Sequence, residues 1–81
     1  MHGIYPAVVK RIRELCDEKK ITPNALSYAS GISQSTVKSI LNGESTNPGI
    51  VTIKKLCDGF GITITDFFDT EEFRNLEQEL Y

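Results

Sequence analysis

Small hydrogen-bonding side chains between residues 33 and 42 are the groups in this chain best suited to specific recognition. Gln34, Ser35, Lys38 and Ser39 lie between apolar positions, on what would be the outer face of a helix. A glutamine amide pairs with adenine N6 and N7, a lysine donates to guanine O6 and N7, and a serine serves either base. These residue types are also common on solvated helix faces. Whether these side chains recognise bases or are simply solvated therefore depends on the elements around them.

Two short helices separated by a tight turn are predicted around these residues. Gly31 tolerates a left-handed turn, and Ser33 is a good N-cap for the helix that follows. Apolar residues recur at intervals of three and four on both sides of Gly31, namely Leu26, Ala29, Ile32, Val37, Ile40 and Leu41. The spacing predicts a helix-turn-helix over 23–43, with its second helix at 33–42.

The same spacing predicts helices before and after this motif. A helix over 6–20 follows a short arm of residues 1–5, and another helix covers 49–60. Thr63 and Asp66 form a capping-box pattern that opens a short fifth helix ending in two phenylalanines. The buried stripe of the 49–60 helix is predicted to be Ile50, Ile53, Leu56, Cys57 and Phe60. No strand pattern occurs, so the predicted fold class is all-α.

An acidic amphipathic helix is predicted at the C-terminal end, over about 70–81. Phe73, Leu76 and Leu80 form a narrow apolar stripe on it. A helix of this length is marginal in water by itself. It must therefore pack on its own domain or on the same helix of a second subunit, and the three apolar residues are candidate dimer contacts.

Length and composition bound the possible classes of protein. Eighty-one residues make a single domain, 1–81, and 40% hydrophobic with 25% charged residues is ordinary for a soluble globular chain. No apolar run reaches the roughly 18 residues of a membrane helix, and no signal peptide is evident, so we expect a cytoplasmic protein. Residues 1–43 hold six Lys or Arg against three Asp or Glu, whereas 44–81 hold three against eight. The positive charge lies in the half with the polar helix.

The sequence gives no sign of catalysis, of a metal or of a cofactor. It has no glycine-rich phosphate loop, its single histidine is His2, and Cys16 and Cys57 stand alone without metal-ligand spacing. Both cysteines are predicted to be buried and reduced. The small core leaves no room for a small-molecule ligand, so we expect a binding protein and not an enzyme.

From about Val8 to Phe68 the chain resembles the phage-repressor or Cro-like helix-turn-helix domains, the xenobiotic-response-element type of bacterial regulator. The resemblance rests on the order and spacing of four segments: IREL from Ile12, GIS at Gly31, SQSTVKSILNG from Ser33 and PGIVTIKKLCDGFGITITDFF from Pro48. It implies a compact five-helix lambda-repressor-like domain, here followed by the short acidic helix, that binds double-stranded operator DNA, usually as a homodimer.

The resemblance also implies roles for individual residues. The positions that contact bases in the family hold Gln34, Ser35, Lys38 and Ser39 here. Contacts to the DNA backbone are expected from Asn24, Ser33, Thr36 and Asn42.

The chain departs from the family pattern at three places. Pro23 stands where a glutamine often reaches a DNA phosphate, which leaves Asn24 or Ser27 to compensate. Ser27 replaces a small alanine and fits if its hydroxyl bonds a backbone carbonyl. Cys16 and Leu41 replace an Arg–Glu pair, and an apolar pair at such a site is often neutral for stability.

Two functions of different classes follow. The first is a sequence-specific transcriptional regulator whose 33–42 helix reads the major groove of an inverted-repeat operator as a homodimer. The alternative is an antitoxin-like or adaptor module that uses the same fold to grip a protein partner through its acidic C-terminal helix.

Overall fold

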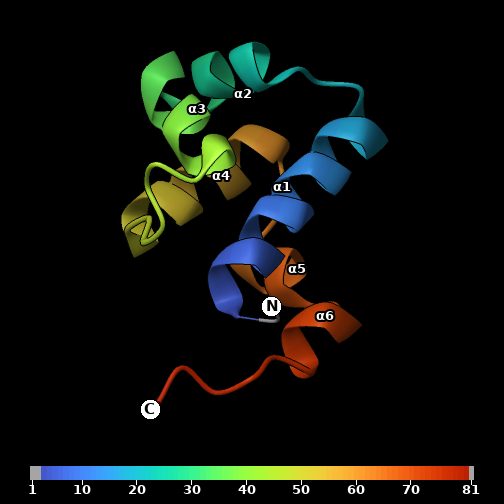
Figure 1. Ribbon diagram of the computed structural model, residues 1–81. Helices are drawn as coiled ribbons and strands as arrows, with labels where there is room; N and C mark the ends of the chain where they lie inside the picture. Colours follow the sequence, from blue (N-terminus) through green and yellow to red (C-terminus); the bar gives the residue numbers. More distant parts are fainter. Residues whose placement is uncertain (1–2, 81) are drawn as a thin grey trace.

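The observed helices lie close to those that the sequence predicts. The computed structural model describes residues 3–80, and over that range it contains six α-helices and no strand. The helices are α1 (Ile4–Lys19), α2 (Pro23–Ser30), α3 (Gln34–Asn42), α4 (Ile50–Phe60), α5 (Ile64–Phe68) and α6 (Glu71–Arg74), arranged as in Figure 1. The predicted all-α fold is confirmed, with α2 and α3 as the helix-turn-helix.

Local signals explain where these helices begin and end. The Thr22 side chain caps α2, with Pro23 at the first helical position, and the Ser33 hydroxyl accepts the Thr36 N–H at the start of α3. Gly31 ends α2 in the left-handed conformation, at φ 67°. At α5, Thr63 forms the predicted capping box. Because each signal depends on neighbours in the sequence, these boundaries could be predicted without the tertiary structure.

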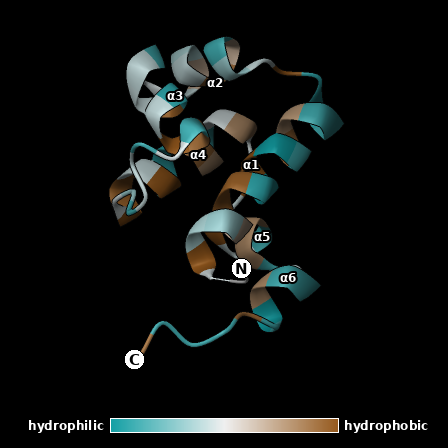
Figure 2. Cartoon of the chain, viewed as in Figure 1, coloured by the Kyte–Doolittle hydropathy of each residue, from teal (hydrophilic) through white to brown (hydrophobic). Residues whose placement is uncertain are grey.

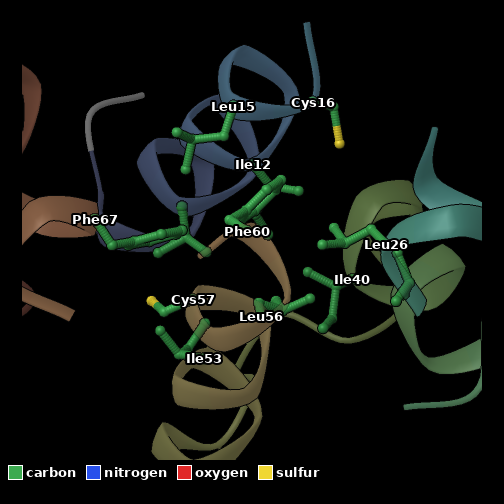
Figure 3. Close-up of a cluster of buried hydrophobic side chains, with 12 residues drawn as sticks. Ile12, Leu15, Cys16, Leu26, Ile40, Ile53, Leu56, Cys57, Phe60 and Phe67 are labelled. Atoms are coloured by element: carbon green, nitrogen blue, oxygen red, sulfur yellow. The ribbon is translucent and has the colours of Figure 1, made fainter. Parts of the chain in front are cut away.

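One hydrophobic core joins the first five helices. The central layer is α4, against which α2 and α5 pack, while α3 packs on α2. Figure 3 shows the side chains converging from α1, α2, α3, α4 and α5, with Phe67 reaching in from α5. The buried cluster consists of Val8, Ile12, Leu15, Cys16, Leu26, Val37, Ile40, Ile53, Leu56, Cys57, Phe60 and Phe67. Its packing fixes α3 with one face inward and the other free.

Two residues predicted on the apolar stripes of α2 and α4 lie outside the core. Ile50 is 68% exposed, because it opens α4 and the first turn of that helix extends past its neighbours (Figure 1). Ala29 is exposed as well, and the buried face of α2 consists of Leu26 with Ser27 and Ser30. Helical spacing identifies a face, but only the neighbouring helices decide how far along the face burial extends.

Both ends of the chain differ from the prediction. The helix predicted over about 70–81 is wrong in length: α6 ends at Arg74, and residues 76–80 carry no helix, while Tyr81 lies outside the described residues. The predicted arm of residues 1–5 is also wrong for its last two residues, because α1 begins at Ile4; Met1 and His2 lie outside the described residues. The segment after α6 runs back to the start of α1, where the Glu79 carboxylate accepts the Ile4 N–H at 3.1 Å. This contact joins the two ends.

Hydropathy follows the packing except at the first turn of α4, where Ile50 and Val51 are exposed. Figure 2 shows hydrophilic residues along the outside of α1 and α6, and hydrophobic ones at the first turn of α4. Over residues 3–80, no helix combines the length and the apolar character that crossing a bilayer requires.

Candidate nucleic-acid interface

The outward face of α3 carries the residues predicted to read bases. Gln34, Ser35 and Lys38 are exposed, and Ser39 is half-buried. The opposite face is held by Val37 and Ile40, which are 3% and 1% exposed. Because both sets lie on one short helix, burying the apolar face necessarily turns the polar one outward.

An open groove of about 640 Å³ runs along this face between three helices, and we call it the α3 groove. It brings together residues that lie far apart in the sequence. Its lining is Arg13 from α1, Pro23 and Asn24 from α2, and Gln34, Ser35, Val37, Lys38, Leu41 and Asn42 from α3. Five of the predicted contact residues therefore share one surface, and Ser33, Thr36 and Ser39 are not part of its lining.

The hydroxyl groups at the start of α3 contact one another. The Ser33 hydroxyl, which already accepts the Thr36 N–H, lies 2.8 Å from the Thr36 hydroxyl and 3.1 Å from that of Ser35. The capping geometry thus gathers three hydroxyl groups at the end of the helix where the first backbone N–H groups have no partner within the helix. Such an end attracts anions, including DNA phosphates.

Arg13 lines the groove but is not among the predicted contact residues, because the sequence offers it only as one of several cations that could reach a phosphate. It is exposed on α1, and its Nη2 lies 3.4 Å from the Leu41 carbonyl oxygen at the end of α3. Nothing in the sequence near Arg13 marks it, because its place depends on how α1 packs against α3. Arginine is well suited to phosphate, since its planar guanidinium donates two parallel hydrogen bonds.

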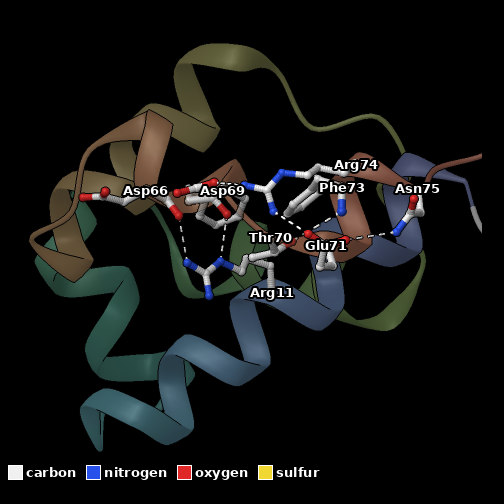
Figure 4. Close-up of polar contacts among 9 residues, drawn as sticks. Arg11, Asp66, Asp69, Thr70, Glu71, Phe73, Arg74 and Asn75 are labelled. Carbon is white, nitrogen blue, oxygen red and sulfur yellow. Dashed lines mark hydrogen bonds and ion pairs between the residues drawn. The ribbon is translucent and has the colours of Figure 1, made fainter.

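Several other cations are engaged elsewhere. Lys10 pairs with Glu72 at 2.6 Å, and Lys54 pairs with Asp58. Arg11 donates to the carbonyls of Asp66 and Phe67 at 2.8 and 2.7 Å, where it closes the end of α5 (Figure 4). In the described part of the chain, Lys38 has no ion pair within 4 Å, so its charge is available at the groove.

The structure accounts for two of the departures from the family pattern. The Ser27 hydroxyl donates to the Asn24 carbonyl at 2.6 Å, which confirms the condition under which a serine fits there. Cys16 is buried in the core, and Leu41 packs against that core, so the structure accommodates the apolar pair. Burial raises the pKa of the Cys16 thiol, and it raises the pKa of the free Cys57 thiol in the same way.

The candidate dimer residues have different environments. Phe73 packs on its own chain, with its ring centroid 4.8 Å from Phe68 and 6.1 Å from Phe67. Leu76 is half-buried beside Lys10, and Leu80 is 84% exposed. The Phe73 ring is therefore already packed within its own chain.

A helix-turn-helix with a polar, outward-facing second helix places this molecule in the class of helix-turn-helix DNA-binding domains. The sequence model of the family described as the Cro/C1-type HTH DNA-binding domain matches residues 11–72. The chain belongs to that family, and the resemblance seen in its sequence is confirmed.

Two similar proteins are consistent with the assignment. The chain is 45% identical over 47 residues to the uncharacterized HTH-type transcriptional regulator RghRB of Bacillus subtilis (strain 168). That match covers 58% of this chain but only 34% of the relative, so the chain spans about a third of its length. The crystal structure of the prophage Lp1 protein 11 superposes with a TM-score of 0.81 at 33% identity, covering 94% of this chain and 100% of that one.

Proposed function

We propose that this protein is a sequence-specific DNA-binding transcriptional regulator of the cytoplasm, with α3 in the major groove of its operator. The observation that carries the proposal is the α3 groove, where amide, ammonium and guanidinium groups from three helices open onto one face. Their donors match the acceptors of base edges and phosphates. Residues 23–43 form the reading element within one domain, 1–81.

The proposed contacts divide into two groups by chemistry. Gln34, Ser35, Lys38 and Ser39 read base edges from the outer face of α3. Asn24, Ser33, Thr36 and Asn42 lie at the ends of α2 and α3 and contact the DNA backbone. Arg13 adds a phosphate contact in the groove next to Pro23, which offers no donor of its own.

A homodimer on an inverted repeat forms part of the proposal, with two α3 helices about 34 Å apart. Because the Phe73 ring already packs within its own chain, the proposed dimer contact uses apolar residues that remain exposed. Among them are Ile50 at 68%, Val51 at 66% and Leu80 at 84%, and an apolar hollow of about 310 Å³ adjoins Ile50.

Selection of bound sequences from a random DNA pool tests the DNA-reading proposal. We expect enrichment of an inverted repeat with half-sites one helical turn apart. Lys38→Met should lower affinity, and Arg13→Met, which removes the proposed phosphate contact, should reduce the slope of log affinity against log salt by about one. The matched control is Lys10→Met, which removes a lysine already paired with Glu72 and should leave the slope unchanged. A pool without enrichment would refute sequence-specific reading.

The antitoxin-like or adaptor alternative is favoured by the same exposed residues, since a partner protein could cover Ile50 and Val51. Sedimentation equilibrium distinguishes the two functions. A homodimer that Ile50→Lys with Val51→Lys converts to monomer supports the regulator, with Tyr28→Lys, at another exposed apolar residue, as control. A monomer that binds no selected DNA supports the alternative.

A further inference from the structure

The C-terminal end of α3 is held by side chains from a different helix. The last four carbonyl groups of an α-helix have no partner within the helix and need one from outside. The Ser39 carbonyl accepts the Glu44 and Ser45 N–H groups of the following loop, both at 3.0 Å. The Ile40 carbonyl accepts the Tyr5 hydroxyl, and the Leu41 carbonyl lies 3.4 Å from Arg13 Nη2. Two of these four carbonyls are thus bound by α1.

These contacts connect α1 directly to the element that presents Gln34 and Lys38. Tyr5 and Arg13 are eight residues apart, or about 12 Å along α1, and they converge on neighbouring carbonyls. The Tyr5 ring is half-buried, and its hydroxyl lies close to Gly43, where α3 ends. A helix of nine residues is short, so fixing its last turn limits how far its whole axis can tilt.

We propose that Tyr5 and Arg13 are positioning residues for DNA reading, which fix the C-terminal end of α3 and thereby the direction of its base-reading side chains. The proposal rests on the proposed function. Neither residue needs to touch a base for this role. Misplacement of a donor by a fraction of an ångström weakens a hydrogen bond to the correct base, while phosphate contacts shared by all sequences tolerate it better. Loss of the contacts should therefore reduce discrimination more than general affinity.

The primary test is Tyr5→Phe, which removes the hydroxyl and keeps the ring. For the measurements on the DNA-free protein, the control is Tyr28→Phe, the same change at a tyrosine that is 81% exposed on α2. In the DNA-free protein, Tyr5→Phe should shift the ¹³C resonance of the Ile40 carbonyl and speed amide exchange in the last turn of α3. Arg13→Met should also speed that exchange. Unchanged exchange in both variants would overturn the proposal.

DNA binding supplies the readout that a purely structural cap would not change. For Tyr5→Phe, the ratio of affinities for the selected sequence and for random DNA should fall by about threefold to tenfold, the range that one hydrogen bond carries. Faster exchange with an unchanged ratio would reduce Tyr5 to a helix cap and overturn its positioning role. If the wild-type chain prefers no sequence, the proposed function fails, while the DNA-free exchange still decides whether Tyr5 fixes the end of α3.

Discussion

Gln34 and Lys38 differ in what they can recognise, although they are one helical turn apart on the same exposed face. The glutamine amide both donates and accepts, which matches the donor and acceptor of adenine in the major groove. Lysine only donates, and it serves guanine or a phosphate equally well. Base preference therefore depends more on Gln34, and affinity depends more on Lys38.

Substitution Gln34→Ala tests this division. We expect it to cost about 1–3 kcal/mol at one position of each half-site and to relax the base preference there. Affinities for a set of operators, each changed at a single base pair, would reveal the effect. An equal loss against every sequence would contradict base reading by Gln34 and leave only a backbone contact.

The buried thiols of Cys16 and Cys57 predict how stability depends on pH. Burial raises the pKa of both groups, so the folded chain keeps its thiols protonated at a pH where the unfolded chain ionises them. The stability that the two buried neutral thiols contribute is complete below the ordinary thiol pKa of about 8.5, and it declines as the pH rises above that value. Urea unfolding between pH 7 and 10 should show a steeper fall for the wild-type chain than for Cys16→Ala with Cys57→Ala. Equal slopes would contradict this prediction.

Among the helices, α2 and α4 approach each other closely at Ser30 and Gly59. A Cβ placed on Gly59 would lie 2.1 Å from the Ser30 hydroxyl oxygen and 3.1 Å from the Ser30 backbone nitrogen. Glycine disfavours a helix by about 1 kcal/mol relative to alanine. It is needed here because the two helices meet with no space for a side chain.

Gly59→Ala should therefore lower the free energy of unfolding by about 1–3 kcal/mol, despite its better helix propensity. Ser30→Ala should instead stabilise by up to about 1 kcal/mol, because the buried Ser30 hydroxyl has no hydrogen-bond partner among the described residues. Combining the two should recover part of the loss, since the nearest clashing atom is gone. Denaturant titration measures all three variants, and a stabilising Gly59→Ala would contradict the close contact.

At the scale of the whole molecule, the segment after α5 packs on its own chain. The Phe73 ring packs on Phe68 and Phe67, Glu72 pairs with Lys10, and Glu79 binds the first turn of α1. The acidic end of the chain thus closes one end of the helix bundle, opposite the helix-turn-helix (Figure 1).

Phe73→Ala should consequently act on stability and not on assembly. We expect the free energy of unfolding to fall by roughly 2 kcal/mol. This is below the range for a fully buried phenylalanine, because the Phe73 ring is only half-buried. Thermal unfolding combined with sedimentation separates the two effects. A variant of unchanged stability that loses its homodimer would return Phe73 to the subunit interface.

The sequence by itself determined the features that depend on near neighbours. The capping side chains of Thr22, Ser33 and Thr63 and the left-handed turn at Gly31 placed α2, α3 and α5, because a helix end is set by residues within one turn of it. The polar face of α3 followed from the same local spacing, so Gln34 could be singled out as a candidate.

The tertiary structure decided everything that depends on contacts between distant segments. The position of α1 beside the end of α3 brings the Arg13 side chain into the groove and the Tyr5 hydroxyl to the Ile40 carbonyl, and residues near in sequence do not determine either contact. Likewise, Ile50 and Phe73 both lie on apolar stripes, yet one is exposed and the other packs against its own domain. Periodicity shows which face of a helix is apolar, whereas burial requires a second surface, and only the folded chain supplies it.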